Sequence, residues 1–116
     1  MNKVALVIHC KPDGAGLSAI YRALMFADEL RRHADDVAIV FDGAGSTAAA
    51  ALLDPTHAQH RLFERVRESV RGVCRFCAQS YGVLERIEGA LPLLAEDRGH
   101  ASLRQLLIEE RQILTY

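Results

Sequence analysis

Residues 3–8 read Lys-Val-Ala-Leu-Val-Ile and decide the fold class. The run is apolar from residue 4 to residue 8 and lacks the alternation of polar and apolar residues that marks a strand with one wet face. A strand buried on both faces is typical of a parallel sheet that lies between layers of helices. Residues 36–41, Asp-Val-Ala-Ile-Val-Phe, repeat the pattern, so we expect two central strands of such a sheet.

Helices are expected after each of these strands. A loop over Pro12–Gly16 is followed by apolar residues at helical spacing from Leu17 to Leu30, which predict a first helix. A turn over Asp42–Thr47 leads to the alanine-rich stretch Ala48–Leu53, which predicts a second helix that ends at Asp54-Pro55.

The middle of the chain is strongly charged. His57–Val70 has one narrow apolar face and predicts an exposed helix that ends before Gly72 and covers a sheet edge or a subunit contact. Gly72–Cys74 is short, but the alternating pattern requires another strand here, so we predict a short third strand.

The last third continues the alternation. Phe76–Ile87 predicts a helix, which Gly82 weakens by roughly 1 kcal/mol relative to alanine. A short apolar piece at Leu91–Leu94, a helix from Ser102 to about Glu110 and a terminal strand over Gln112–Tyr116 follow. Short connections between alternating strands and helices favour one α/β domain over residues 1–116, with a parallel sheet covered on both faces.

Composition excludes several classes of function. The 14 basic residues are interspersed with 15 acidic ones, so no basic stripe is offered to a nucleic acid. Apolar runs are far shorter than a membrane span, and the N-terminus lacks the features of a signal peptide, which predicts a cytosolic protein. The odd count of three cysteines argues against a disulfide framework and leaves reduced, reactive thiols.

Cys74 and Cys77 are the sharpest candidates for chemistry. We expect Cys74 at the carboxyl end of a parallel strand and Cys77 in the first turn of the next helix, where open α/β sheets keep their active sites. A helix N-terminus and the neighbouring Arg75 both favour a thiolate. The alternative is that the two cysteines are small buried hydrophobes. For Cys77 this alternative and a functional role are about equally supported, whereas a functional role is favoured for Cys74.

Other candidate sites are weaker. Cys10 also ends a strand, but nothing around it repeats this arrangement, so we assign it to the core. A zinc site normally needs four ligands, and one Cys-x-x-Cys pair leaves only histidines or carboxylates to complete it, so metal is a minority interpretation. The histidines available in principle are His9 beside the expected site, His57 and His60 on the exposed helix, and His100 before the last helix.

The glycine-rich stretches do not predict a cofactor. Asp13–Gly16 and Gly43–Gly45 follow strands and precede helices, where backbone amides can hold an anion. Neither has the spacing of a P-loop or a full dinucleotide fingerprint, so ordinary tight turns are expected. The sequence also lacks the Gly-x-Ser-x-Gly elbow of a hydrolase.

Three stretches of the chain together resemble a known family: residues 72–78, Gly-Val-Cys-Arg-Phe-Cys-Ala, then Tyr81-Gly82-Val83, and the ending Gln112–Tyr116. They are similar to the DsrE-like family of small sulfur-handling proteins. This resemblance implies a three-layer α/β/α sandwich with a mostly parallel five-stranded sheet, assembled into homo-trimers or homo-hexamers. It also implies that Cys74 accepts sulfane sulfur as a persulfide, without a cofactor, and exchanges it with donor and acceptor proteins.

Three interpretations remain open from the sequence. Cys77 is either a resolving thiol, which releases sulfide from the Cys74 persulfide and closes a disulfide, or a sign of dithiol redox chemistry. A binding or assembly module with structural cysteines would instead use the His57–Val70 helix for its contacts. A metal site that uses both cysteines is the third interpretation, besides the sulfur or redox role and the binding module.

Overall fold

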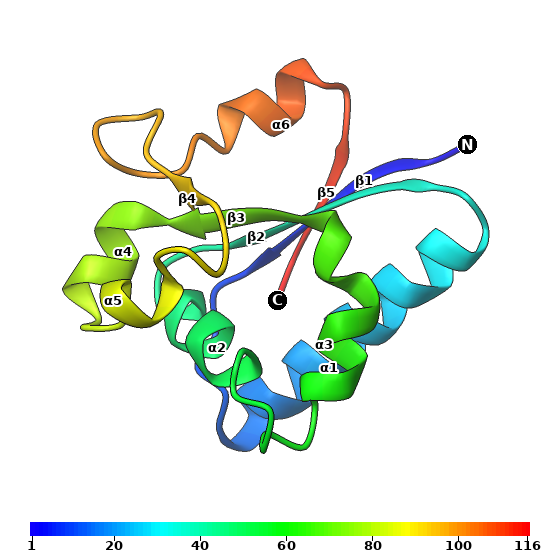
Figure 1. The fold of residues 1–116 in the computed structure, drawn as a ribbon. Coiled ribbons are helices and arrows are strands. Elements are labelled where there is room, and N and C mark those ends of the chain that lie inside the picture. The colour runs from blue at the N-terminus through cyan, green and yellow to red at the C-terminus, as the bar shows by residue number, and fades with distance from the viewer.

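The computed structural model describes residues 1–116 and contains one five-stranded sheet. All neighbouring strands are parallel, in the order β4-β3-β2-β1-β5 (Figure 1). The strands are β1 (Lys3–Ile8), β2 (Asp36–Phe41), β3 (Val70–Cys74), β4 (Leu93–Leu94) and β5 (Gln112–Thr115). The predicted α/β class with a five-stranded parallel sheet is confirmed.

Helices cover the two faces of the sheet unequally. One face carries nearly all of them, and the other carries only α6 (Figure 1). The helices are α1 (Gly14–Arg32), α2 (Gly45–Leu52), α3 (His60–Val66), α4 (Arg75–Ser80), α5 (Leu84–Ile87) and α6 (Arg104–Ile108), with a 3₁₀ turn, η1 (Arg67–Ser69), after α3. No helix combines the length and the apolar character needed to cross a lipid bilayer.

Strand β1 explains why the run at residues 3–8 has no polar alternation. Val4, Leu6 and Ile8 point into the larger core beneath α1, α2 and α3. Ala5 and Val7 point to the opposite face, where they join a small cluster closed by α6. Successive side chains of a strand point to opposite faces, and both faces are buried here, so every position is apolar.

The predicted helix over His57–Val70 is wrong in its bounds and in the element that it covers, while its narrow apolar face is confirmed. The α-helix spans only His60–Val66, and Val70 already belongs to β3. Phe63 and Val66 are fully buried, and α3 packs against α1 rather than over a sheet edge (Figure 1). Helical spacing identified the apolar face but not the element that buries it.

Two other predicted helices differ from the structure. The expected helix over Phe76–Ile87 is broken into α4 and α5, because Gly82 adopts φ +74°, a left-handed conformation that ends a helix. The expected helix from Ser102 to Glu110 is the shorter α6. The first two helices begin earlier than expected, at Gly14 and Gly45, and the third strand is longer, beginning at Val70.

Candidate functional site

Three neighbouring strands bring the candidate residues to one edge of the sheet. Cys74 is the last residue of β3, while Asp42 follows β2 and His9 follows β1. Because β2 lies between β3 and β1 and all three are parallel, these residues lie side by side at the carboxyl edge. Cys77 joins them from α4, as predicted.

Cys74 is fully buried and lies against an imidazole. Its Sγ is 3.6 Å from Nδ1 of His100. The Cys77 Sγ completes a group in which the two sulfurs and a His100 ring nitrogen all lie within 4.8 Å of one another. A thiol beside an imidazole is the usual arrangement of an activated cysteine nucleophile.

The loop before α6 holds His100 in place. Asp97 and His100 exchange two backbone hydrogen bonds of 2.9 and 2.8 Å, which close a tight turn. The ring of Phe76, in α4, stacks against the His100 ring with centroids 4.3 Å apart, and the Phe76 N–H donates to the Gly99 carbonyl at 3.1 Å. The imidazole is therefore tied to the same helix that carries Cys77.

Cys77 is half-buried and faces a carboxylate. Its thiol donates to Oδ1 of Asp42 at 3.7 Å, and Oδ2 of Asp42 is 3.6 Å from Nδ1 of His9. Burial, first of all, and then a hydrogen bond to the Cys74 sulfur and the charge of Asp42 raise the pKa of the Cys77 thiol to about 12. Cys77 therefore remains a thiol at neutral pH and can donate its hydrogen to negative charge on a neighbouring atom.

The electrostatic support that we predicted for Cys74, from Arg75 and the start of α4, stays a prediction. The Arg75 side chain is exposed and forms no hydrogen bond or ion pair with either cysteine. The first amides of α4 are not all free, because the Phe76 N–H is bonded to Gly99. The groups that contact the two sulfurs are instead the imidazole of His100 and the carboxylate of Asp42.

The remaining sequence candidates lie away from this site or support it. Cys10 packs against the larger core and its thiol donates to the Gly16 carbonyl at 3.5 Å, as a core cysteine would. The His57 ring accepts from the Gln59 N–H, and the His60 ring contacts the Leu52 carbonyl at 2.7 Å, so both histidines fix local structure. Only His9 and His100 of the four histidines considered reach the carboxyl edge.

Two residues of the site, Asp42 and His100, were not singled out in the sequence as groups that contact the cysteines. Asp42 was predictable, because it directly follows β2 at the edge where Cys74 ends β3. His100 carried none, since its position depends on how the loop after β4 folds back onto α4.

A cavity of about 480 Å³ opens beside the site. Its charged lining is mainly acidic, from Asp42, Glu96 and Asp97, with Arg104 as the one cation. His100 lines this cavity and contacts Cys74, whereas neither cysteine lines the cavity itself.

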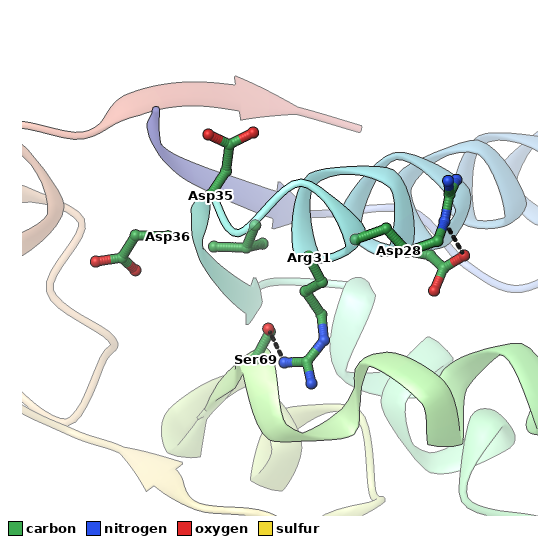
Figure 2. A pocket seen from close by; sticks show the side chains of 7 residues that line it. Asp28, Arg31, Asp35, Asp36 and Ser69 are labelled. Atoms are coloured by element: carbon green, nitrogen blue, oxygen red, sulfur yellow. Dashed lines mark hydrogen bonds and ion pairs between the residues drawn. The ribbon is translucent and has the colours of Figure 1, made fainter. Parts of the chain in front are cut away.

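A second hollow, of about 450 Å³, lies at the opposite edge of the sheet (Figure 2). Arg31 reaches across it to the Ser69 hydroxyl at 2.6 Å. Asp28 is paired with Arg32 and with Arg65 at 3.3 and 2.9 Å. Arg31, Asp28 and Arg32 are thus already paired, and the contacts of Arg31 and Asp28 join α1 to the segment around α3.

Comparisons with known proteins identify a related sequence and two solved structures with the same fold. No sequence profile of a known protein family matches the chain. An uncharacterized protein of Methanocaldococcus jannaschii, MJ0733, is 33% identical over 107 residues, which cover 90% of this chain and 88% of the relative. At this identity and coverage the two proteins are members of one family.

Two solved structures share the fold. The YchN protein of Escherichia coli superimposes with a TM-score of 0.71, 19% identity and full coverage of both chains. The conserved protein of unknown function BT1422 from Bacteroides thetaiotaomicron gives 0.67 and 19%, over 97% of this chain and 94% of its own. YchN is a DsrE-like protein, so the resemblance noted in the sequence is confirmed at the level of the fold.

Proposed function

We propose that this chain, which belongs to the same family as MJ0733 and has the DsrE-like fold of YchN, carries sulfane sulfur as a persulfide on Cys74. The observation that carries the proposal is the placement of the buried Cys74 sulfur 3.6 Å from His100 Nδ1, with a second thiol within 4.8 Å, at the carboxyl edge of a parallel sheet. The Cys74 sulfur is then the acceptor of the sulfane sulfur. His100 is able to take its proton, and the Cys77 thiol is able to donate a hydrogen bond to the negative charge that forms.

Loading of Cys74 needs no net oxidation. The proton of Cys74 passes to His100, and the thiolate attacks the outer sulfur of a donor persulfide. A new S–S bond forms at Cys74 while the S–S bond of the donor breaks, and the donor leaves as a thiolate. The Cys77 thiol, which stays protonated, is placed to donate a hydrogen bond to negative charge on the bound sulfur.

Unloading has two routes. An acceptor nucleophile attacks the terminal sulfur, and Cys74 leaves as the thiolate. Alternatively, the Cys77 thiol passes its proton to the terminal sulfur as its own sulfur attacks Cys74 Sγ, and hydrosulfide leaves, so that the sulfane sulfur is reduced while the two cysteines are oxidised to a disulfide. The closeness of the two sulfurs supports the second route as well as the first, and a dithiol redox role is the alternative function.

Intact mass spectrometry after incubation with a sulfane-sulfur donor tests the proposal. We expect the native chain to gain one sulfur atom, Cys74→Ser to gain none, and Cys77→Ser to keep the gain for longer. Cys10→Ser is the matched control, because it removes a thiol outside the site and should behave as the native chain. A loss of two hydrogens abolished by either Cys74→Ser or Cys77→Ser would favour the redox alternative, and no change in any variant would refute both.

We propose further that the chain works as a homo-oligomer, a trimer or hexamer. The support is the apolar surface of α6 on the thinly covered face, where Leu107 and Ile108 are 62% and 54% exposed. Light scattering of native chain after gel filtration should give a multiple of the 12.8 kDa chain mass. Leu107→Glu should lower this mass, whereas Arg104→Glu on the same helix serves as a control for the charge change.

A further inference from the structure

We propose that Cys74, Cys77 and His100 form a binding site for a thiophilic divalent metal ion of the zinc type, with three protein ligands and an open fourth position. The sequence offered only two ligands in one Cys-x-x-Cys pair. The third comes from a loop 23 residues further along the chain than Cys77, which the fold returns to the same edge of the sheet. This inference concerns metal binding alone and does not depend on the proposed sulfur transfer.

Distances within the group fit a tetrahedral ion. Bonds of about 2.3 Å to sulfur and about 2.0–2.1 Å to nitrogen at tetrahedral angles place two ligand atoms about 3.5–3.8 Å apart. Cys74 Sγ and His100 Nδ1 are 3.6 Å apart, within this range. The widest separation in the group is at most 4.8 Å, so a closure of about 1 Å by side-chain rotation completes the set.

Burial and charge also favour an ion at this position. Cys74 is fully buried, where an isolated thiolate is costly, and a divalent ion bound by two thiolates is neutral as a complex. The two thiol protons leave to solvent on binding, and the neutral imidazole donates its Nδ1 lone pair. No oxidation state changes in this step.

The acidic cavity lies next to the three proposed ligands, because His100 and Asp42 line it although neither cysteine does. Asp42 Oδ1 lies 3.7 Å from Cys77 Sγ, close to the spacing expected between two ligands of one ion. Glu96 and Asp97 line the same cavity, and their negative charge attracts a cation that approaches the site. Three protein ligands with an open position are the pattern of sites that bind a further small ligand, in contrast to closed structural sites with four protein ligands.

Cobalt titration of the reduced, metal-free chain tests the site. We expect one Co²⁺ per chain, with the near-ultraviolet absorption of thiolate-to-cobalt charge transfer and the visible bands of a tetrahedral ion, and displacement by one equivalent of Zn²⁺. Cys74→Ser and Cys77→Ser should lose most of the charge-transfer absorption. His100→Gln should weaken binding by at least about tenfold, a loss that even supporting residues of metal sites produce.

Matched controls and a measurement on the native chain keep the test decisive. Cys10→Ser and His33→Gln change the same residue types outside the group and should bind as the native chain does; His33 is exposed at the end of α1. In the native chain, binding of one Zn²⁺ should release two protons into weakly buffered solution, as read by a pH indicator, and Cys10→Ser should release the same number. Absence of stoichiometric binding, binding without thiolate absorption, or equal losses in the controls would overturn the proposal.

The two proposals at this site fail separately. The cobalt titration contains no sulfur donor, and the sulfur-loading experiment contains no metal. A Cys74-dependent sulfur gain in a chain that binds no metal would remove only the metal site.

Discussion

Removing the carboxylate of Glu109 should destabilise the fold in a way that depends on pH. Glu109 follows α6 and accepts two hydrogen bonds from Arg71 of β3, at 2.9 and 2.6 Å, and one from Arg111 at 2.8 Å. Arg111 is only 7% exposed and also bonds to Asp36, at the start of β2. This ion-pair group joins β2 and β3 to the segment between α6 and β5.

The magnitude follows from the exposure of the group. Breaking a buried ion pair costs about 3–5 kcal/mol, and an exposed pair contributes about 0.2–1 kcal/mol. The Glu109 side chain is 22% exposed, so solvent screens it in part and we expect Glu109→Gln to cost about 2–3 kcal/mol at pH 7. With a urea dependence of about 1.5 kcal/mol per molar, the unfolding midpoint should fall by about 1–2 M.

The loss of stability should itself disappear in acid. Hydrogen bonds from Arg71, and then from Arg111, lower the pKa of Glu109 well below its usual range. A carboxyl with a depressed folded-state pKa stabilises the fold fully above its unfolded pKa of about 4.3, and this stabilisation is lost as the pH falls toward the folded value. The difference between the native chain and Glu109→Gln should therefore be full at pH 6–7 and shrink below about pH 4.

Urea unfolding curves at pH 7, 5, 4 and 3, followed by circular dichroism, measure this difference. Glu110→Gln is the matched control, because the neighbouring Glu110 is exposed and has no hydrogen-bond partner for its side chain. A cost below about 0.5 kcal/mol for Glu109→Gln at pH 7, or a cost that does not change between pH 6 and pH 3, would refute the reasoning.

Three further predictions concern the core, the sheet and the thiols. Phe63→Ala should cost about 3–5 kcal/mol in thermal or urea unfolding, because Phe63 is fully buried and stacks edge-on against Phe41 at 6.3 Å, whereas exposed Arg61→Ala should stay within about 0.5 kcal/mol; similar losses would contradict the packing of α3. Gly72→Ala should destabilise the sheet by about 1–3 kcal/mol in the same assay, since its Cβ would lie 2.7 Å from the Pro92 carbonyl oxygen, while a neutral result would mean that β4 moves freely. Alkylation of Cys77 at pH 8.5 should be at least about 100-fold slower in the folded chain than in urea, because its pKa near 12 leaves little thiolate; equal rates by peptide mass spectrometry would contradict that pKa.

Local patterns were sufficient for the framework of the fold. Residues 3–8 and 36–41 are apolar without alternation, and in the structure both strands are buried on both faces at the centre of a parallel sheet. The position of Cys74 at the end of β3 followed from the alternation of elements, because a parallel sheet forces each strand to end at the same edge. Cys77 followed from its spacing of three residues.

Helix bounds and burial were less predictable because they depend on partners. His57–Val70 shows a charged helix with a narrow apolar face, yet only its packing against α1 and the contact of Phe63 with Phe41 decide that Phe63 is core. Gly82 was counted as a small cost within one helix, and in the structure its left-handed conformation separates α4 from α5. A helix-propensity cost of about 1 kcal/mol is too small to show whether the chain forms one continuous helix or two short ones.

The sequence by itself determined that the chain is an α/β protein and that two thiols lie where a strand ends and the next helix begins, since both conclusions rest on residue types at short spacing. The tertiary structure decided what surrounds those thiols. Asp42 reaches Cys77 because β2 lies beside β3 in the sheet order, and His100 reaches Cys74 because a turn after β4 stacks it on Phe76. Contacts between segments distant along the chain are set by strand order and loop closure, which no local pattern of residues encodes.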